Sequence, residues 1–253
     1  MTRFSANLGF LYTELSLPDA IRAAAFAGFD AVECHWPSDV PAGDVRTALD
    51  EAGLPMLGLN TVRGDEGENG LSALVGREED ARAAIDQAID YASKVKASNI
   101  HVMAGFANGA DAHACFVNNL EYACMKAAPH SLMILIEPLN HNDAPGYFLQ
   151  TTAQAKDIID TVKADNIKLM FDCYHVHIME GDLILRLQEL MPVIGHIQFA
   201  SVPARAEPDQ GEVNYAHIFE TLCALGYDAP LGAEYKPRTS TDAGLAWMNT
   251  YKS

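Results

Sequence analysis

Eight short apolar segments recur along this chain, and a longer segment with helical periodicity follows each of them. The apolar segments are the predicted strands 4–11, 30–35, 54–59, 99–104, 132–136, 167–171, 193–199 and 231–235. A strand that is apolar without a polar break is typical of a parallel sheet buried on both faces. Eight such units, with no linker between them, predict one domain over residues 1–253, folded as an α/β protein with a single (β/α)8 TIM barrel.

An open, doubly wound sheet is the main alternative to the barrel. Its dinucleotide-binding form carries a GxGxxG motif after the first strand, and this chain has none there. One connection is unusual in either fold, because residues 60–76 are rich in glycine and charge and exceed the usual length of a strand-to-helix loop. This segment is interpreted either as a lid over the substrate or as a surface insertion.

Charge and cysteine content exclude several classes of protein. The formal net charge of −17 argues against a nucleic-acid or anionic-membrane surface, which needs clustered lysine and arginine. An anionic substrate would therefore need a local cationic site. The 5 cysteines are widely spaced and include no CxxC, which favours reduced thiols in a cytoplasmic protein. No apolar run reaches the length of a membrane span, and no partner interface is indicated, although barrel enzymes often form homo-oligomers.

Oxygen-bearing side chains follow four successive apolar runs. Glu137 ends the run LMILI, and Asp172, Gln198 and Glu234 end the next three. Each of them taken alone is also compatible with the start of a polar loop. Together they predict a cluster, because the carboxyl ends of all barrel strands meet at the face that carries the active site. Such oxygens are the ligands that Mg²⁺ or Mn²⁺ prefers, and no organic cofactor is indicated.

Glu137 and Glu234 come from the fifth and eighth predicted strands and so approach the barrel axis from different sides. Two carboxyl groups that flank a substrate can take a proton from one carbon and return one to its neighbour. A divalent cation would stabilise the enediolate that forms between these two proton transfers. We therefore predict that these two glutamates are catalytic as well as metal-binding.

Four further side chains are candidates for substrate binding. His175 lies three residues after Asp172, in what the pattern indicates is a loop, and His141 follows the fifth strand. Arg205 and Lys236 lie in the seventh and eighth loops, where they would supply positive charge to a carboxylate. The alternative for the histidines is a structural role, and for the cations it is a solvated surface position.

Two other histidines, His101 and His196, lie inside strand-like runs. We interpret both of them as core histidines whose hydrogen bonds are satisfied within the protein.

Five motifs in this order resemble the hydroxypyruvate isomerase family of xylose isomerase-like TIM barrels. They are IEPLN at 136–140, FDCYH at 171–175, GHIQFA at 195–200, GEVNY at 211–215 and GAEYKPR at 232–238. The likeness extends over essentially the whole chain, including LGFLYTE at 8–14, ECHWP at 33–37 and GLSALVGRE at 70–78.

The resemblance implies a divalent metal held by Glu137, Asp172, Gln198 and Glu234, with the two glutamates as proton donor and acceptor. It also implies interconversion of hydroxypyruvate and tartronate semialdehyde, or of a related 2-oxo sugar acid. Ketose 3-epimerases look similar around EPLN and DxYH and are the alternative on the same site. Phosphodiester hydrolysis at damaged DNA and non-catalytic binding of a sugar acid are the other classes. The net charge counts against the first, and the glutamate pair counts against the second.

Overall fold

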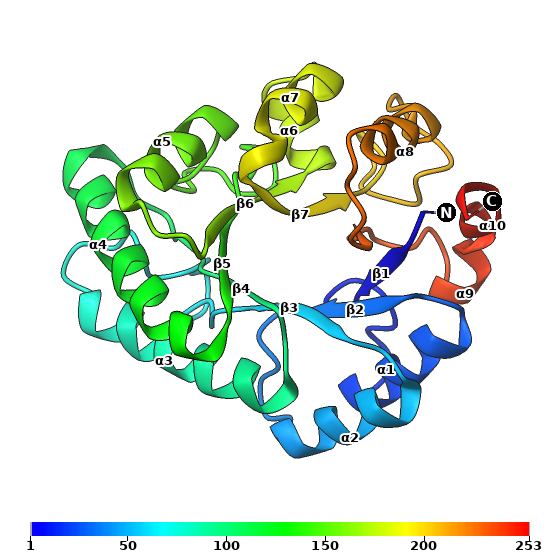
Figure 1. Cartoon of the computed structure of the whole chain (residues 1–253), viewed down its shortest axis with the longest axis horizontal. Helices are drawn as coiled ribbons and strands as arrows, with labels where there is room; N and C mark the ends of the chain where they lie inside the picture. The colour runs from blue at the N-terminus through cyan, green and yellow to red at the C-terminus, as the bar shows by residue number, and fades with distance from the viewer. Residues whose placement is uncertain (1, 253) are drawn as a thin grey trace.

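The computed structural model describes residues 2–252, and eight parallel strands close into one barrel in chain order. The strands are Phe4–Asn7 (β1), Ala31–Cys34 (β2), Met56–Asn60 (β3), Asn99–His101 (β4), Met133–Ile136 (β5), Ile167–Asp172 (β6), Ile194–Phe199 (β7) and Leu231–Ala233 (β8). Figure 1 shows the ring of strands surrounded by helices. The predicted TIM barrel is therefore confirmed.

Helices follow the strands around the outside of the ring. They are Leu17–Phe26 (α1), Ala42–Ala52 (α2), Glu78–Val95 (α3), Gly109–Ala127 (α4), Thr152–Val162 (α5), Cys173–Met179 (α6), Leu183–Leu190 (α7), Tyr215–Ala224 (α8), Thr241–Gly244 (α9) and Ala246–Tyr251 (α10). Their ends have local causes. The Ser16 hydroxyl accepts a hydrogen bond from the Asp19 N–H at the start of α1. Gly53 ends α2 in the left-handed region, at a φ of +67°.

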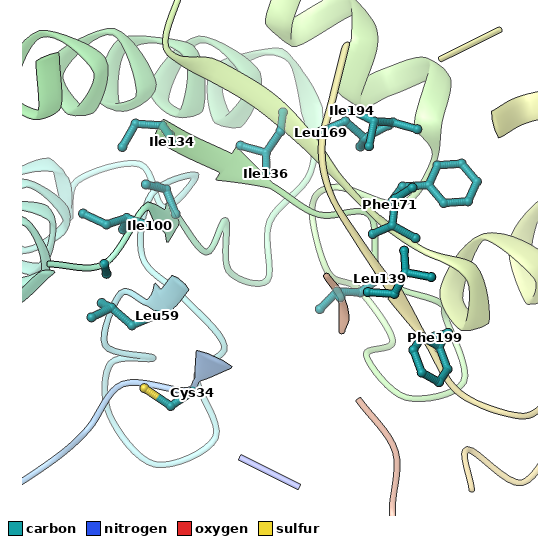
Figure 2. Close-up of a cluster of buried hydrophobic side chains, with 14 of the residues drawn as sticks. Cys34, Leu59, Ile100, Ile134, Ile136, Leu139, Leu169, Phe171, Ile194 and Phe199 are labelled. Carbon is teal, nitrogen blue, oxygen red and sulfur yellow. The ribbon is translucent and has the colours of Figure 1, made fainter. Parts of the chain in front are cut away.

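The hydrophobic core lies between the strands and the helices. One face of α3 is apolar and buried, from Ala81 through Ile85 and Ile89 to Ala92. Figure 2 labels ten core side chains that follow the barrel wall from Cys34 on β2 to Phe199 on β7. Within the part of the chain that the structure describes, no helix is long and apolar enough to cross a membrane.

Three strands end two or more residues earlier than predicted. β1 ends at Asn7, whose side-chain oxygen accepts the Gly9 N–H at 2.9 Å, a common way for asparagine to start a turn. β4 ends at His101, and the residues after it contact the long segment before α3. β8 ends at Ala233, so Glu234 already belongs to the following loop.

The long segment 61–77 is fixed to the barrel along its second half. Gly70 forms an antiparallel bridge with Ala104, and the Ala73 N–H donates to the Ala104 carbonyl at 2.7 Å. A side chain at Gly70 would meet the Met103 carbonyl oxygen at 2.4 Å, so only glycine fits this close approach. The first half of the segment faces the carboxyl ends of the strands, where it forms part of a cavity wall.

Candidate active site

The four side chains predicted as metal ligands all reach the carboxyl end of the barrel and are buried. Their exposed fractions are between 1% and 6%, for Glu137, Asp172, Gln198 and Glu234. The strand register explains part of this arrangement, because Asp172 on β6 lies opposite Gln198 on β7. In a parallel sheet such neighbours project to the same side. One ligand atom each from Glu137, Asp172, Glu234 and His175 lie within 4.8 Å of one another.

Three buried oxygen atoms of this cluster have no hydrogen-bond partner. They are Oε1 of Glu137, Oδ2 of Asp172 and Oε1 of Gln198. Unpaired buried polar atoms are costly, so three together indicate that something absent from the protein chain satisfies them. The three carboxylates of the cluster, with the guanidinium of Arg205 beside them, leave a formal charge of −2. Carboxylate and amide oxygens with this charge fit a hard divalent cation.

The acid groups of the cluster cannot all ionise easily without such a cation. Burial, followed by the charges of Glu234 and Asp172, raises the pKa of Glu137 well above its ordinary value. Burial and the charge of Glu234 raise the pKa of Asp172 to about 8. Burial also raises the pKa of Glu234, although Arg205 opposes this shift. A divalent cation bound here would therefore compete with protons for the same oxygens.

His175 lies on the short helix α6 rather than in the loop that the sequence pattern predicts. Asp172 caps this helix, because its Oδ1 accepts the Tyr174 N–H at 2.8 Å and leaves Oδ2 facing the cluster. The backbone N–H of Asn140 donates to Nδ1 of His175 at 3.0 Å, and the Asn140 side-chain amide donates to the same atom at 2.7 Å.

Burial, followed by the charge of Arg205, lowers the pKa of His175 well below its ordinary value. The neutral ring therefore accepts at Nδ1 and carries its proton on Nε2. Nε2 lies 3.6 Å from Oδ2 of Asp172. With its proton there, His175 is a hydrogen-bond donor toward the cavity rather than a fifth ligand.

Arg205 is mostly buried and reaches the cluster from the loop after β7. Its Nη2 lies 2.7 Å from Oε2 of Glu234, and its Nη1 lies 3.1 Å from Oδ2 of Asp143. The guanidinium lies over the rings of Phe10 and Tyr174, at 4.6 Å and 4.9 Å from their centroids. Burial lowers the pKa of Arg205, but the surrounding carboxylates raise it more, so this side chain stays charged.

The cluster opens into a cavity of about 690 Å³. The predicted substrate-binding residues His175, Arg205 and Lys236 line it. His141, the fourth of them, does not line the cavity: its Nδ1 lies 2.9 Å from the Met179 sulfur, and its side chain is exposed. The long loop after β5 carries His141 away from the barrel axis.

Several cavity residues were missed or misinterpreted from the sequence. The interpretation of His101 as a satisfied core histidine is wrong, because neither ring nitrogen has a hydrogen-bond partner and Nδ1 lies 3.5 Å from Oε2 of Glu137. His196 fits the interpretation as a satisfied core histidine, because its Nε2 lies 2.5 Å from Oε2 of Glu33. Arg63 and His35 also line the cavity. In the sequence, the unusual length of segment 60–76 was the one feature that pointed to Arg63 as a cavity residue.

Comparison with known proteins shows the family of this chain. The profile of the family described as xylose isomerase-like TIM barrel matches residues 21–251. The 2-oxo-tetronate isomerase of Cupriavidus necator is 45% identical over 99% of both chains, and the hydroxypyruvate isomerase of Escherichia coli is 38% identical over 100% of both. A crystal structure from Brucella melitensis, described as a family 2 AP endonuclease, superposes with a TM-score of 0.96 at 38% identity over 99% of both chains. The chain therefore belongs to the xylose isomerase-like TIM barrels and, within them, to the family of the hydroxypyruvate and 2-oxo-tetronate isomerases.

Proposed function

We propose that this protein is a metal-dependent isomerase of short 2-oxo sugar acids, acting on hydroxypyruvate or on the four-carbon 2-oxo-tetronate. The observation that carries the proposal is the set of three buried, unpaired oxygens of Glu137, Asp172 and Gln198 at the end of a cavity with a cationic wall. A divalent cation held by these residues and Glu234 would polarise the substrate carbonyl and stabilise the charge of an enediolate. The family relationship supports the same reaction class.

The reaction exchanges the ketone at C2 with the hydroxyl at C3, and it needs one proton removed and one returned. Glu137 and Glu234 face the same cluster from different strands, so one takes the proton from C3 and the other delivers a proton to C2. A proton also has to move between the two substrate oxygens. Nε2 of His175 and Nη2 of Arg205 lie 3.3 Å apart, both as donors. An oxygen of the substrate between them would satisfy both donors and hold the substrate in place.

The charge of the cavity wall favours an anionic substrate. Lys236 lies on the same side of the cavity as Arg205, and the backbone N–H of Lys236 donates to the Arg205 carbonyl at 2.8 Å. Arg63 comes from segment 61–77, and its charge acts on that side of the cluster. Burial, followed by the charge of Arg63, lowers the pKa of His35, and burial, His35 and then Arg63 lower the pKa of His101. In residues 2–252, no hydrogen bond or ion pair engages the side-chain nitrogens of Arg63 or Lys236. Both cations are therefore free to bind a carboxylate.

DNA cleavage is less consistent with this site, although the Brucella protein carries that description. The net charge of −17 repels a polyanion, and the cluster contains one histidine, whose proton lies on the nitrogen that faces the carboxylates.

The proposal is tested by NMR with purified protein, Mg²⁺ or Mn²⁺, and deuterated water. Hydroxypyruvate, 2-oxo-tetronate and a neutral ketose of similar size are each incubated with and without EDTA. We expect metal-dependent isomerisation of at least one acid, with deuterium at the carbon that receives the proton. Turnover of the ketose alone would replace the proposal by 3-epimerisation, and turnover of none with the metal bound would reject it.

The role of Arg63 gives a separate prediction. We expect Arg63→Ala to raise KM for the anionic substrate about tenfold while kcat stays within about threefold, because a tenfold change corresponds to about 1.4 kcal/mol of binding. Arg22→Ala is the matched control, since Arg22 is an exposed arginine on α1 that pairs with Glu51 outside the cavity. Steady-state kinetics measure both variants. An unchanged KM in the Arg63 variant would remove this residue from substrate binding.

A further inference from the structure

The side-chain amide of Gln198 has two unlike ends, and only its oxygen can face a cation. Its Nε2 donates to Oε1 of Glu33 at 2.9 Å, while its own Oε1 is buried without a partner. The two amide ends are nearly equal in size, so packing alone does not decide between them. Glu33 decides, with a longer contact from the same nitrogen to Oε1 of Glu234 at 3.5 Å, because the opposite orientation would place the amide oxygen against carboxylate oxygens.

Glu33 lies on β2, across the barrel from β7, and every neighbour that contacts its carboxylate donates to it. Asn7 donates from Nδ2 at 3.2 Å, Ser5 from its hydroxyl at 3.4 Å, and His196 lies at 2.5 Å. The Glu33 carboxylate therefore acts as a hydrogen-bond acceptor toward these side chains and toward Gln198.

The backbone leaves room for this contact across the barrel. Gly232 lies opposite Gln198 in the register of β7 and β8. A Cβ atom at this glycine would lie 2.6 Å from Oε1 of Glu33 and 2.7 Å from Cγ of Gln198. Any larger residue would therefore push apart the two side chains that meet there.

We propose that Glu33 is a positioning residue: it fixes the amide of Gln198 so that Oε1 faces the metal site. It also acts on Glu234, because Nδ2 of Asn7 donates both to Oε1 of Glu33 and, at 2.9 Å, to Oε1 of Glu234. Partners that orient metal ligands in this way typically change metal affinity 10- to 100-fold when they are removed. The inference rests on the proposed metal site.

The test is the dissociation constant for Mn²⁺, measured by electron paramagnetic resonance on the whole protein. In Glu33→Gln, the new amide can turn either way, so it no longer dictates the orientation of Gln198. We expect Mn²⁺ to bind about 10-fold more weakly or worse. Ser5→Ala is the matched control, because it removes a hydrogen bond to Glu33 without touching Gln198, and it should bind Mn²⁺ as the wild type does.

Exchanging the two functional groups gives a second readout that a merely structural role would not move. In Glu33→Gln with Gln198→Glu, the carboxylate at 198 presents an oxygen to the metal in either orientation, while the amide at 33 donates to its other oxygen. We expect the double variant to bind Mn²⁺ more tightly than either single variant, since Gln198→Glu alone would face Glu33 with a like charge. Strictly additive effects on binding would contradict this coupling.

Three outcomes are distinguishable. Wild-type protein that binds no Mn²⁺ would overturn the proposed function and, with it, this inference. Wild-type binding together with unchanged binding in Glu33→Gln would overturn the positioning role alone. If Glu33→Gln does not fold, as judged by the melting temperature of the metal-free protein, Glu33→Asp replaces it. That variant keeps the charge beside His196 but withdraws the carboxylate from Gln198, so weaker Mn²⁺ binding is again expected, and unchanged binding would reject the role.

Discussion

Glu137→Gln and Glu234→Gln should each lower kcat by about 1,000-fold or more. General acid–base groups contribute about 10²- to 10⁴-fold to the rate, and each glutamate is also a proposed metal ligand. A glutamine keeps the shape and a ligand oxygen but cannot carry the transferred proton. Glu212→Gln is the matched control, since Glu212 is exposed and pairs with His177 outside the cavity. Steady-state rates are measured at saturating Mn²⁺, after metal binding has been confirmed for each variant.

Deuterium exchange adds an assignment to this test. A variant that has lost only the group that returns the proton still removes it, so recovered substrate would gain deuterium from solvent without forming product. The other variant would show neither exchange nor product. The pattern therefore identifies which glutamate acts first in each direction. A variant that keeps kcat within about tenfold of wild type with metal bound would exclude that glutamate from proton transfer.

Removing the metal should abolish turnover and lower the melting temperature. A cation at 100 times its dissociation constant adds about 2.7 kcal/mol to the free energy of unfolding. For a chain of 253 residues this corresponds to about 5–10 °C. Differential scanning calorimetry with EDTA and with Mg²⁺ measures the shift. Full turnover in EDTA-treated protein shown to be metal-free would contradict the prediction.

The size of this shift should depend on pH. The pKa of Asp172 is raised from 3.8 to about 8 without metal, so between these values the native state holds a proton that the unfolded chain has lost. The stability of the metal-free protein should therefore fall as pH rises from about 4 to about 8. The metal displaces this proton, so Mg²⁺ should raise the melting temperature more at about pH 8 than at about pH 6. A shift independent of pH would argue against competition at these oxygens.

The barrel and the convergence of four ligand candidates were predictable because they depend on periodicity. Each ligand candidate follows an apolar strand, and a closed parallel barrel brings the carboxyl ends of all strands together. Glu137 and Glu234 therefore meet although 97 positions separate them in the sequence. The helix α6 was missed because its residues, CYHVHIM, follow a strand directly without a polar loop. Its start depends on the Asp172 cap, which a pattern of apolar residues does not register.

The finer geometry of the site was not accessible from the sequence. Whether His101 is satisfied depends on which side chains surround it, and those come from other strands. The distance between Arg63 and the cluster depends on how segment 61–77 folds back over the barrel end, which Gly70 permits through a contact with residue 103. His141 and His175 are both near strand ends in the sequence, and only the path of the chain separates their positions.

The hydrogen bond from Asn7 to Glu234 joins the first strand to the residue after the last, across the seam where the barrel closes. Any piece of the chain that holds both partners spans at least residues 7–234, so the centre is complete only once the final strand has docked. A nascent chain still missing its last strand lacks Glu234 and cannot bind the cation as the finished protein does. Cation binding would therefore stabilise only completed barrels, favouring whole molecules over truncated ones.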